Sequence, residues 1–99
     1  MGKPHYTEYA SHAFRCYARN RGSGIPLHTE AERQDWQACE KAIEVIKPHA
    51  GMILECYQGC LSFSENLAAV SVRYQVSQNY LWILNNTLLK QFAMERGLI

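Results

Sequence analysis

The sequence predicts an all-α fold of about five helices in a single small domain that ends in a helix-turn-helix. Apolar residues recur at spacings of three and four along most of the chain, as they do on the buried face of a helix. Glycine, proline and helix-capping residues divide the chain into segments of helical length. A chain of 99 residues can bury one modest core and is too short for two domains.

The first expected helix covers residues 6–21, where tyrosine, alanine and phenylalanine form an apolar face and arginines collect at the C-terminal end. A glycine-rich joint at residues 22–28 then interrupts the helical pattern. Thr29 is placed to cap a second helix, and Glu32 completes a capping box. Residues 29–99 are expected to form the helical core.

Three further helices are expected in this core. Lys47-Pro48 marks a boundary, because proline suits the first turn of a helix, and a short helix then runs to about Gln58 before Gly59 ends it. Ser62 or Ser64 caps a fourth helix, and Ser77 begins a last one that Gly97 stops after Arg96. The inward residues expected in these last two helices are Leu67, Val70, Tyr74, Leu81, Leu84, Leu88 and Phe92.

The net charge of +1 hides a gradient along the chain. Residues 1–28 carry a net charge of +3, residues 29–47 carry −2, and residues 48–99 are balanced. Affinity for nucleic acid depends largely on Lys and Arg side chains that neutralise phosphates. Any attraction to phosphate must therefore begin in the N-terminal helix.

Several classes of protein are not expected. No apolar run approaches the ~20 residues of a membrane span, and the N-terminal MGKPHYTEY lacks the apolar segment of a secretory signal, so a cytoplasmic protein with reduced cysteines is expected. Cys56 and Cys60 lack the tight spacing of paired zinc ligands. No catalytic arrangement is found, so we expect no enzyme, no metal and no other cofactor.

The stretch VSVRYQVSQNYLWILNNTLL, residues 70–89, has the spacing of a helix-turn-helix at about 64–90. In such a motif the N-terminal residues of the second helix lie at the base edges of the major groove. Gln78, Asn79 and Tyr80 take this place, and Gln and Asn side chains suit the donor and acceptor pair of adenine. The same apolar spacing would also occur in any helical hairpin, simply as core.

The run LAAVSVRYQVSQNYLWIL, with the preceding AGMILECY and the terminal FAMERGLI, resembles the sigma-70 region 4-like helix-turn-helix proteins of Gram-positive phages and mobile elements. The resemblance covers roughly residues 36–99 and implies a small transcriptional regulator that binds duplex DNA. It departs from the family pattern at Gln75, where such turns often have glycine, and at Ser71, where alanine is common. The expected phosphate contacts are Arg15, Arg19, Arg21 and Arg73.

A protein partner is the alternative, because the second helix of the motif has no Lys or Arg before Lys90. Tyr80, Trp82 and Leu89 cannot all point inward together with the leucines of the same helix, unless that helix is buried on most sides. These three residues are therefore candidates for contact with a partner or within a homodimer. The corresponding function is a phage-encoded inhibitor of a host nucleic-acid-processing protein, similar in kind to anti-CRISPR proteins.

Overall fold

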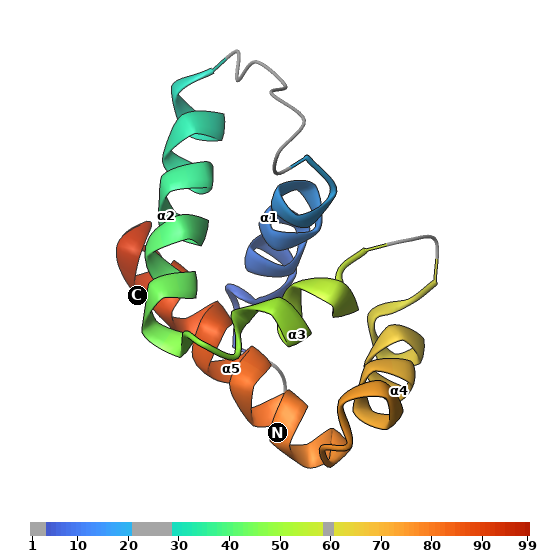
Figure 1. The fold of residues 1–99 in the computed structure, drawn as a ribbon. Helices are drawn as coiled ribbons and strands as arrows, with labels where there is room; N and C mark the ends of the chain where they lie inside the picture. The colour runs from blue at the N-terminus through green and yellow to red at the C-terminus, as the bar shows by residue number, and fades with distance from the viewer. Residues whose placement is uncertain (1–3, 21–28, 59–60) are drawn as a thin grey trace.

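The computed structural model describes residues 4–20, 29–58 and 61–99, and over these residues it confirms the predicted all-α fold. The described chain forms five helices and no strand (Figure 1). The helices are α1 (Thr7–Asn20), α2 (Glu30–Ile46), α3 (Ala50–Cys56), α4 (Phe63–Tyr74) and α5 (Gln78–Glu95). The predicted joint at 22–28, and with it Arg21, Gly59 and Cys60, lie outside the described residues.

The helices begin where the sequence places capping side chains. The Oγ1 of Thr29 accepts a hydrogen bond from the backbone N–H of Glu32 at 3.0 Å, and Ser62 forms a reciprocal capping box with Glu65. Ser77 caps α5 by accepting from the N–H of Tyr80 at 3.0 Å. Gly97 follows the end of α5 with a φ of 72°, a left-handed conformation that favours glycine.

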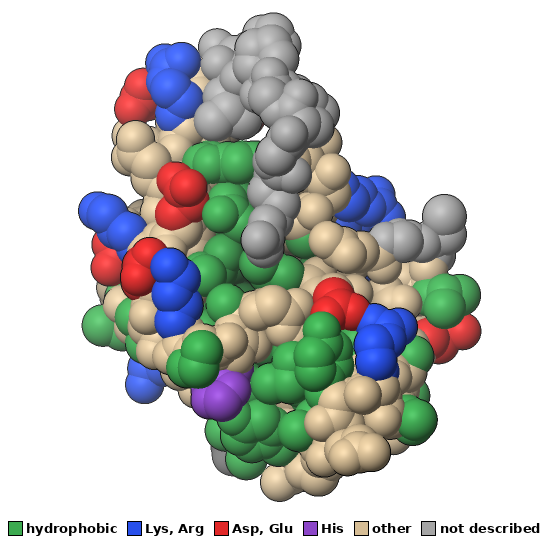
Figure 2. All heavy atoms as spheres, viewed as in Figure 1, with side chains coloured by type: hydrophobic (Ala, Val, Ile, Leu, Met, Phe, Trp, Pro, Cys, Tyr) green, Lys and Arg blue, Asp and Glu red, His purple; other side chains and the backbone are tan. Residues whose placement is uncertain are grey.

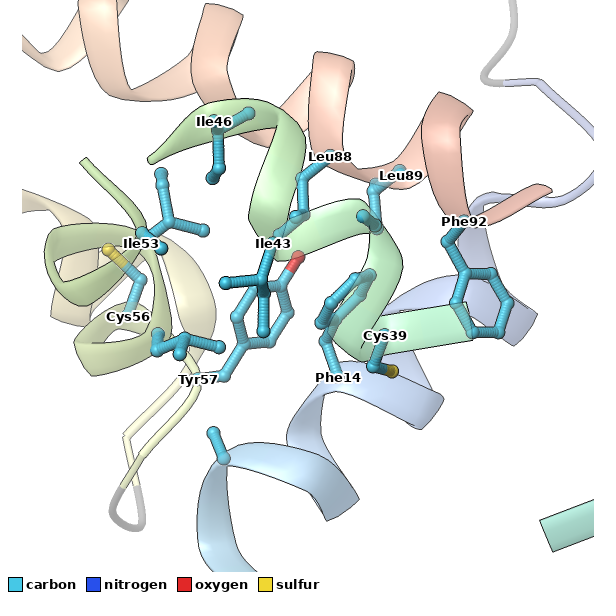
Figure 3. Close-up of a cluster of buried hydrophobic side chains, with 14 of the residues drawn as sticks. Phe14, Cys39, Ile43, Ile46, Ile53, Cys56, Tyr57, Leu88, Leu89 and Phe92 are labelled. Atoms are coloured by element: carbon cyan, nitrogen blue, oxygen red, sulfur yellow. The ribbon is translucent and has the colours of Figure 1, made fainter. Parts of the chain in front are cut away.

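α2 and α5 run in opposite directions against each other. Arg96, just past the end of α5, bonds to Asp35 in the first half of α2, whereas Tyr80 at the start of α5 contacts His49, just past the end of α2. α1 and α3 close the other side of the core (Figures 1 and 3). α5 therefore touches each of the other four helices.

Aromatic side chains from distant segments form the centre of the core (Figure 3). The Phe14 ring of α1 lies 5.5 Å from that of Phe92 on α5 and 5.9 Å from that of Tyr57, which directly follows α3. All three side chains are buried. Burying such rings contributes roughly 1.5–3 kcal/mol each from the area removed from water, so these contacts fix α1 on α3 and α5.

The structure corrects two expectations about which residues face inward. Tyr74 was expected in the inward stripe of α4, but it is 42% exposed and its hydroxyl donates to the carboxylate of Glu55 on α3. Leu89 was a candidate for partner contact, but it is only 3% exposed. Because α1 to α4 all pack on α5, both Leu88 and Leu89 are covered, and Leu89 has no surface to offer a partner.

Within the described residues, no helix is both long and apolar enough to cross a membrane.

Candidate functional site

Three residues, Gln75, Val76 and Ser77, connect α4 to α5. Gln75 has a φ of 56°, so the chain reverses through a left-handed residue at the position where glycine is common in such turns. The N–H of Val76 donates to the carbonyl of Ser71 at 3.1 Å, and the Ser71 hydroxyl donates to the carbonyl of Val76 at 2.6 Å. A serine at this position thus ties the turn to α4, which alanine could not do.

The predicted base-reading residues divide into two groups. Gln78 and Asn79 are exposed in the first turn of α5, and neither side chain has a hydrogen-bond partner among the described residues. Tyr80 is half-buried, and its ring packs edge-on against His49 with centroids 5.9 Å apart. Gln78 and Asn79 are therefore available to a ligand, whereas Tyr80 lies towards the link between α2 and α3.

The predicted phosphate-binding arginines lie in different surroundings. Arg73 and the hydroxyl of Tyr74 both donate to the carboxylate of Glu55. The hydrogen bond between Tyr74 and Glu55 is the main cause that raises the pKa of Tyr74. Arg19 is exposed in the last turn of α1. Arg15 is half-buried on the same helix and makes no hydrogen bond or ion pair with any described residue.

Most of the positive charge in the described chain is already paired. Five of its eight Lys and Arg residues form ion pairs with carboxylates: Arg33, Lys41, Lys47, Arg73 and Arg96. Figure 2 shows basic and acidic side chains next to each other on the face viewed, while hydrophobic and uncharged side chains predominate at its lower end, over α4 and the start of α5. The face viewed carries no continuous basic patch.

A groove of about 250 Å³ lies between α1, the start of α4 and the middle of α5. Arg15 lines it from α1, and Phe63 of α4 and Trp82 of α5 also line it, with ring centroids 5.2 Å apart. Trp82 is 38% exposed. The remaining lining residues are Pro4, Thr7, Ser11, Tyr57, Ser62, Ser64, Asn85, Asn86 and Leu89. The structure thus brings together Arg15, Trp82 and the buried Leu89, which the sequence singled out separately.

A buried polar pair lies at the floor of this groove. The hydroxyl of Tyr57 donates to Oδ1 of Asn85, and both residues are at most 5% exposed. Burial raises the pKa of Tyr57, so its phenol stays neutral and keeps donating. Asn85 was not among the residues predicted to face inward, although its place four residues after Leu81 and three before Leu88 on one helix face indicates a core position.

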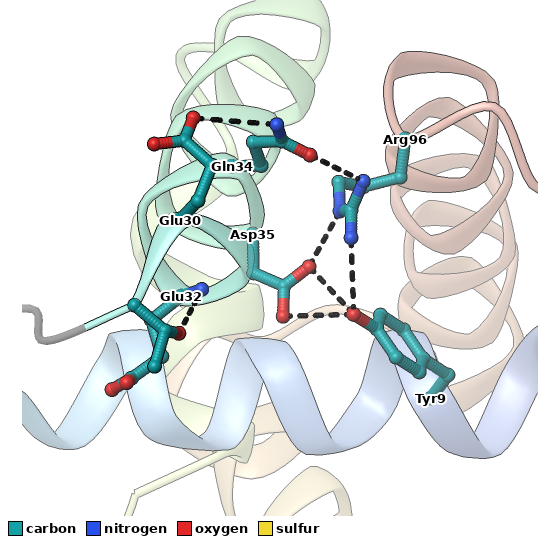
Figure 4. A network of polar contacts seen from close by, with 7 residues as sticks. Tyr9, Glu30, Glu32, Gln34, Asp35 and Arg96 are labelled. Carbon is teal, nitrogen blue, oxygen red and sulfur yellow. Dashed lines mark hydrogen bonds and ion pairs between the residues drawn. The ribbon is translucent and has the colours of Figure 1, made fainter.

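A second polar cluster joins three helices (Figure 4). The guanidinium of Arg96 donates from Nε to Asp35 at 2.6 Å and from Nη1 to Gln34 at 3.0 Å, and its Nη2 lies 3.4 Å from the hydroxyl of Tyr9. That hydroxyl donates to the Asp35 carboxylate, whose two oxygens lie 2.9 and 3.0 Å away. Since these partners are 26 to 87 residues apart in sequence, no local pattern could reveal the cluster.

The described thiols fall into two kinds. Cys39 and Cys56 are buried, and desolvation raises the pKa of both, that of Cys56 to about 11. Cys16 is exposed, with its Sγ 3.8 Å from Nε2 of His12, beside a 280 Å³ pocket that also contains Asp35. Within the described residues, no group of three or more His, Cys, Asp or Glu side chains is arranged to hold a metal ion.

No protein-family model, curated protein or solved structure matches this chain.

Proposed function

We propose that this protein is a small, non-enzymatic regulator of phage or mobile-element type that binds duplex DNA through a helix-turn-helix formed by α4 and α5. The observation that carries the proposal is the exposure of Gln78 and Asn79 in the first turn of α5, directly after a three-residue turn. A recognition helix presents side chains to base edges from this position. Free amide side chains can supply the paired donor and acceptor that adenine requires.

The arginines support this proposal by their position relative to α4. Arg15 shares the groove with Ser64 at the start of α4, and Arg73 lies in the last turn of that helix. The two cations therefore lie towards opposite ends of the first helix of the motif, where positive charge favours contacts to phosphates. Arg19, and Arg21 outside the described residues, are proposed as further phosphate contacts.

The ion pair between Arg73 and Glu55 is a weak obstacle to phosphate binding. The side chains are 58% and 28% exposed, and such surface pairs contribute about 0–1 kcal/mol. A phosphate can therefore replace the Glu55 carboxylate as the partner of Arg73.

The test is selection of duplex DNA from a random library, followed by fluorescence anisotropy at several salt concentrations. We expect binding that weakens with salt, and we expect Arg73→Gln to reduce the slope of log affinity against log salt by about 0.9. Gln78→Ala and Asn79→Ala should lose preference for the selected sequence, while the matched control Gln37→Ala, on the exposed face of α2, should not. Absence of binding at low salt would end the proposal.

A protein partner is the second candidate, as in an inhibitor of a host nucleic-acid-processing protein. It is favoured by the groove that contains Trp82 and Arg15, since Trp and Arg are enriched where binding energy concentrates in protein interfaces. Most cations of the described residues already have carboxylate partners, which also suits a protein better than a polyphosphate. Sedimentation equilibrium will show whether the partner is a second copy of the chain.

A further inference from the structure

The groove between α1, α4 and α5 combines one unpaired cation with an aromatic wall. Arg15 is half-buried, has no hydrogen-bond or ion-pair partner among the described residues, and faces a lining that contains no Asp or Glu. A partly desolvated guanidinium without an anion is unfavourable compared with one that is paired. The groove therefore has an electrostatic preference for a negatively charged group.

Polar groups around Arg15 reinforce this preference. Thr7, Ser11 and Arg15 are spaced by four residues and form a row along α1, so two hydroxyls accompany the guanidinium. Ser62 and Ser64 place the N-terminal end of α4 at the groove, and helix N-termini favour anions because their first N–H groups have no intrahelical partner. The carboxylate of Glu65 is already engaged in the capping box with Ser62.

The size and composition of the groove indicate what carries the negative charge. A volume of about 250 Å³ is below the ~300–1,000 Å³ of pockets that enclose a small molecule, so one or two side chains fit better. Arg15 is the only Lys or Arg among the described lining residues, which matches a single carboxylate better than a chain of phosphates. The rings of Trp82 and Phe63 provide an apolar surface beside it.

We infer that this groove is a docking site for an acidic segment of a partner protein, in which a carboxylate pairs with Arg15 and a neighbouring apolar side chain packs against Trp82 and Phe63. The inference rests on the protein-binding candidate above and names its contact surface. It does not depend on DNA binding by Gln78 and Asn79, which lie about two turns before Asn86 on α5.

The probe is a phage-displayed library of random peptides selected on the full chain, with the Trp82→Ala variant used to remove peptides that bind elsewhere. We expect the enriched peptides to share an Asp or Glu next to an aromatic or large aliphatic residue. Replacing that carboxylate by its amide should weaken binding to the wild-type chain about tenfold, or about 1.4 kcal/mol. The same replacement should change binding to Arg15→Gln by less than about twofold.

Two further variants keep the test informative if Trp82→Ala does not fold. Asn86 is exposed at the edge of the groove, so a substitution there changes its charge without disturbing the core. Asn86→Lys should tighten binding of the acidic peptides and Asn86→Glu should weaken it, each by roughly threefold to tenfold from a single nearby charge. Arg33→Gln, which removes an exposed arginine of α2, is the matched control and should have no effect.

Three outcomes would overturn the inference: no enrichment over unselected phage, enriched peptides without a shared acid, or equal binding to Arg15→Gln and wild type. Displacement of the peptides by duplex DNA in an Arg15-dependent manner would also overturn it, since the groove would then belong to the DNA footprint. DNA binding is measured separately by anisotropy, so its failure and the failure of peptide docking are distinguishable.

Discussion

Removing the Arg96 guanidinium should destabilise the protein although the side chain lies near its surface. Arg96 donates hydrogen bonds to Asp35 and Gln34 on α2 and lies beside the hydroxyl of Tyr9 on α1, so one side chain joins the end of α5 to two other helices. The bond to Asp35, and then that to Tyr9, raises the pKa of Arg96, which shows that the charged form is favoured. Arg96 and Asp35 are 19% and 26% exposed.

The magnitude follows from the partly buried charge. Hydrogen bonds to charged groups contribute about 1.5–3 kcal/mol, and with a fifth to a quarter of both side chains still in water we take about 2 kcal/mol for Arg96→Gln. For a domain of this size, about 2 kcal/mol lowers the melting temperature by roughly 8–16 °C. Lys90→Gln is the matched control, because Lys90 is exposed on α5 itself and should change stability by less than about 0.5 kcal/mol.

Urea denaturation followed by far-UV circular dichroism measures both variants. A double-mutant cycle with Asp35→Asn should then give a coupling energy of about 1 kcal/mol or more, since the two groups share one network. Strict additivity of Arg96→Gln and Asp35→Asn, or a loss as small as that of Lys90→Gln, would refute the reasoning.

Three further predictions concern the core and the turn. Tyr57→Phe should cost about 1–3 kcal/mol in urea denaturation because Oδ1 of Asn85 loses its buried donor; if Tyr57→Phe combined with Asn85→Leu is no more stable than Tyr57→Phe alone, the pair does not act this way. Gln75→Gly should stabilise the fold by up to about 1 kcal/mol by relieving the left-handed backbone, and a lower melting temperature would contradict this. Burial raises the pKa of Cys39 and Cys56 above the ordinary thiol value of 9.0. The contribution of each neutral thiol to the free energy of unfolding is complete below pH 9.0. It decreases by ~1.4 kcal/mol per pH unit as pH rises towards the folded-state pKa, which is about 11 for Cys56. Cys56→Ala should reduce the steepness of this slope by about 1 kcal/mol per pH unit between about pH 9.5 and 10, and an unchanged slope would exclude the thiol as a cause.

The ends of the helices are predicted well from the sequence. Thr29, Ser62 and Ser77 cap helices because each hydroxyl bonds to a backbone N–H only three residues away. Gly97 ends α5 by its own conformation. These contacts lie within one turn of the chain, so they form independently of how the helices pack against each other.

Burial on α5 could not be predicted in the same way. Leu89 looked surplus to one apolar face, because the number of helices that cover α5 cannot be read from the sequence. The same limit applies to the groove: Arg15 and Trp82 are 67 residues apart, and only the packing of α1 against α5 places them together. The charge gradient predicted that the N-terminal helix would carry the positive charge of a binding surface, but it did not predict which part of α5 that helix would face.

The contacts that hold α1 also determine how the molecule opens. Two of them join residues far apart in sequence. Nη2 of Arg96 lies 3.4 Å from the hydroxyl of Tyr9, 87 positions away, and Nε2 of His5, just before α1, lies 3.0 Å from the carbonyl of Leu98, 93 positions away. Closing such long loops costs conformational entropy, so we expect these contacts to form late in folding and to open before the others. Detachment of α1 would dismantle the groove around Arg15 while leaving the short-range turn between α4 and α5 in place. Hydrogen exchange should therefore be faster in α1 than in α5. A partly open state without α1 should lack the groove beside Trp82 but still expose Gln78 and Asn79.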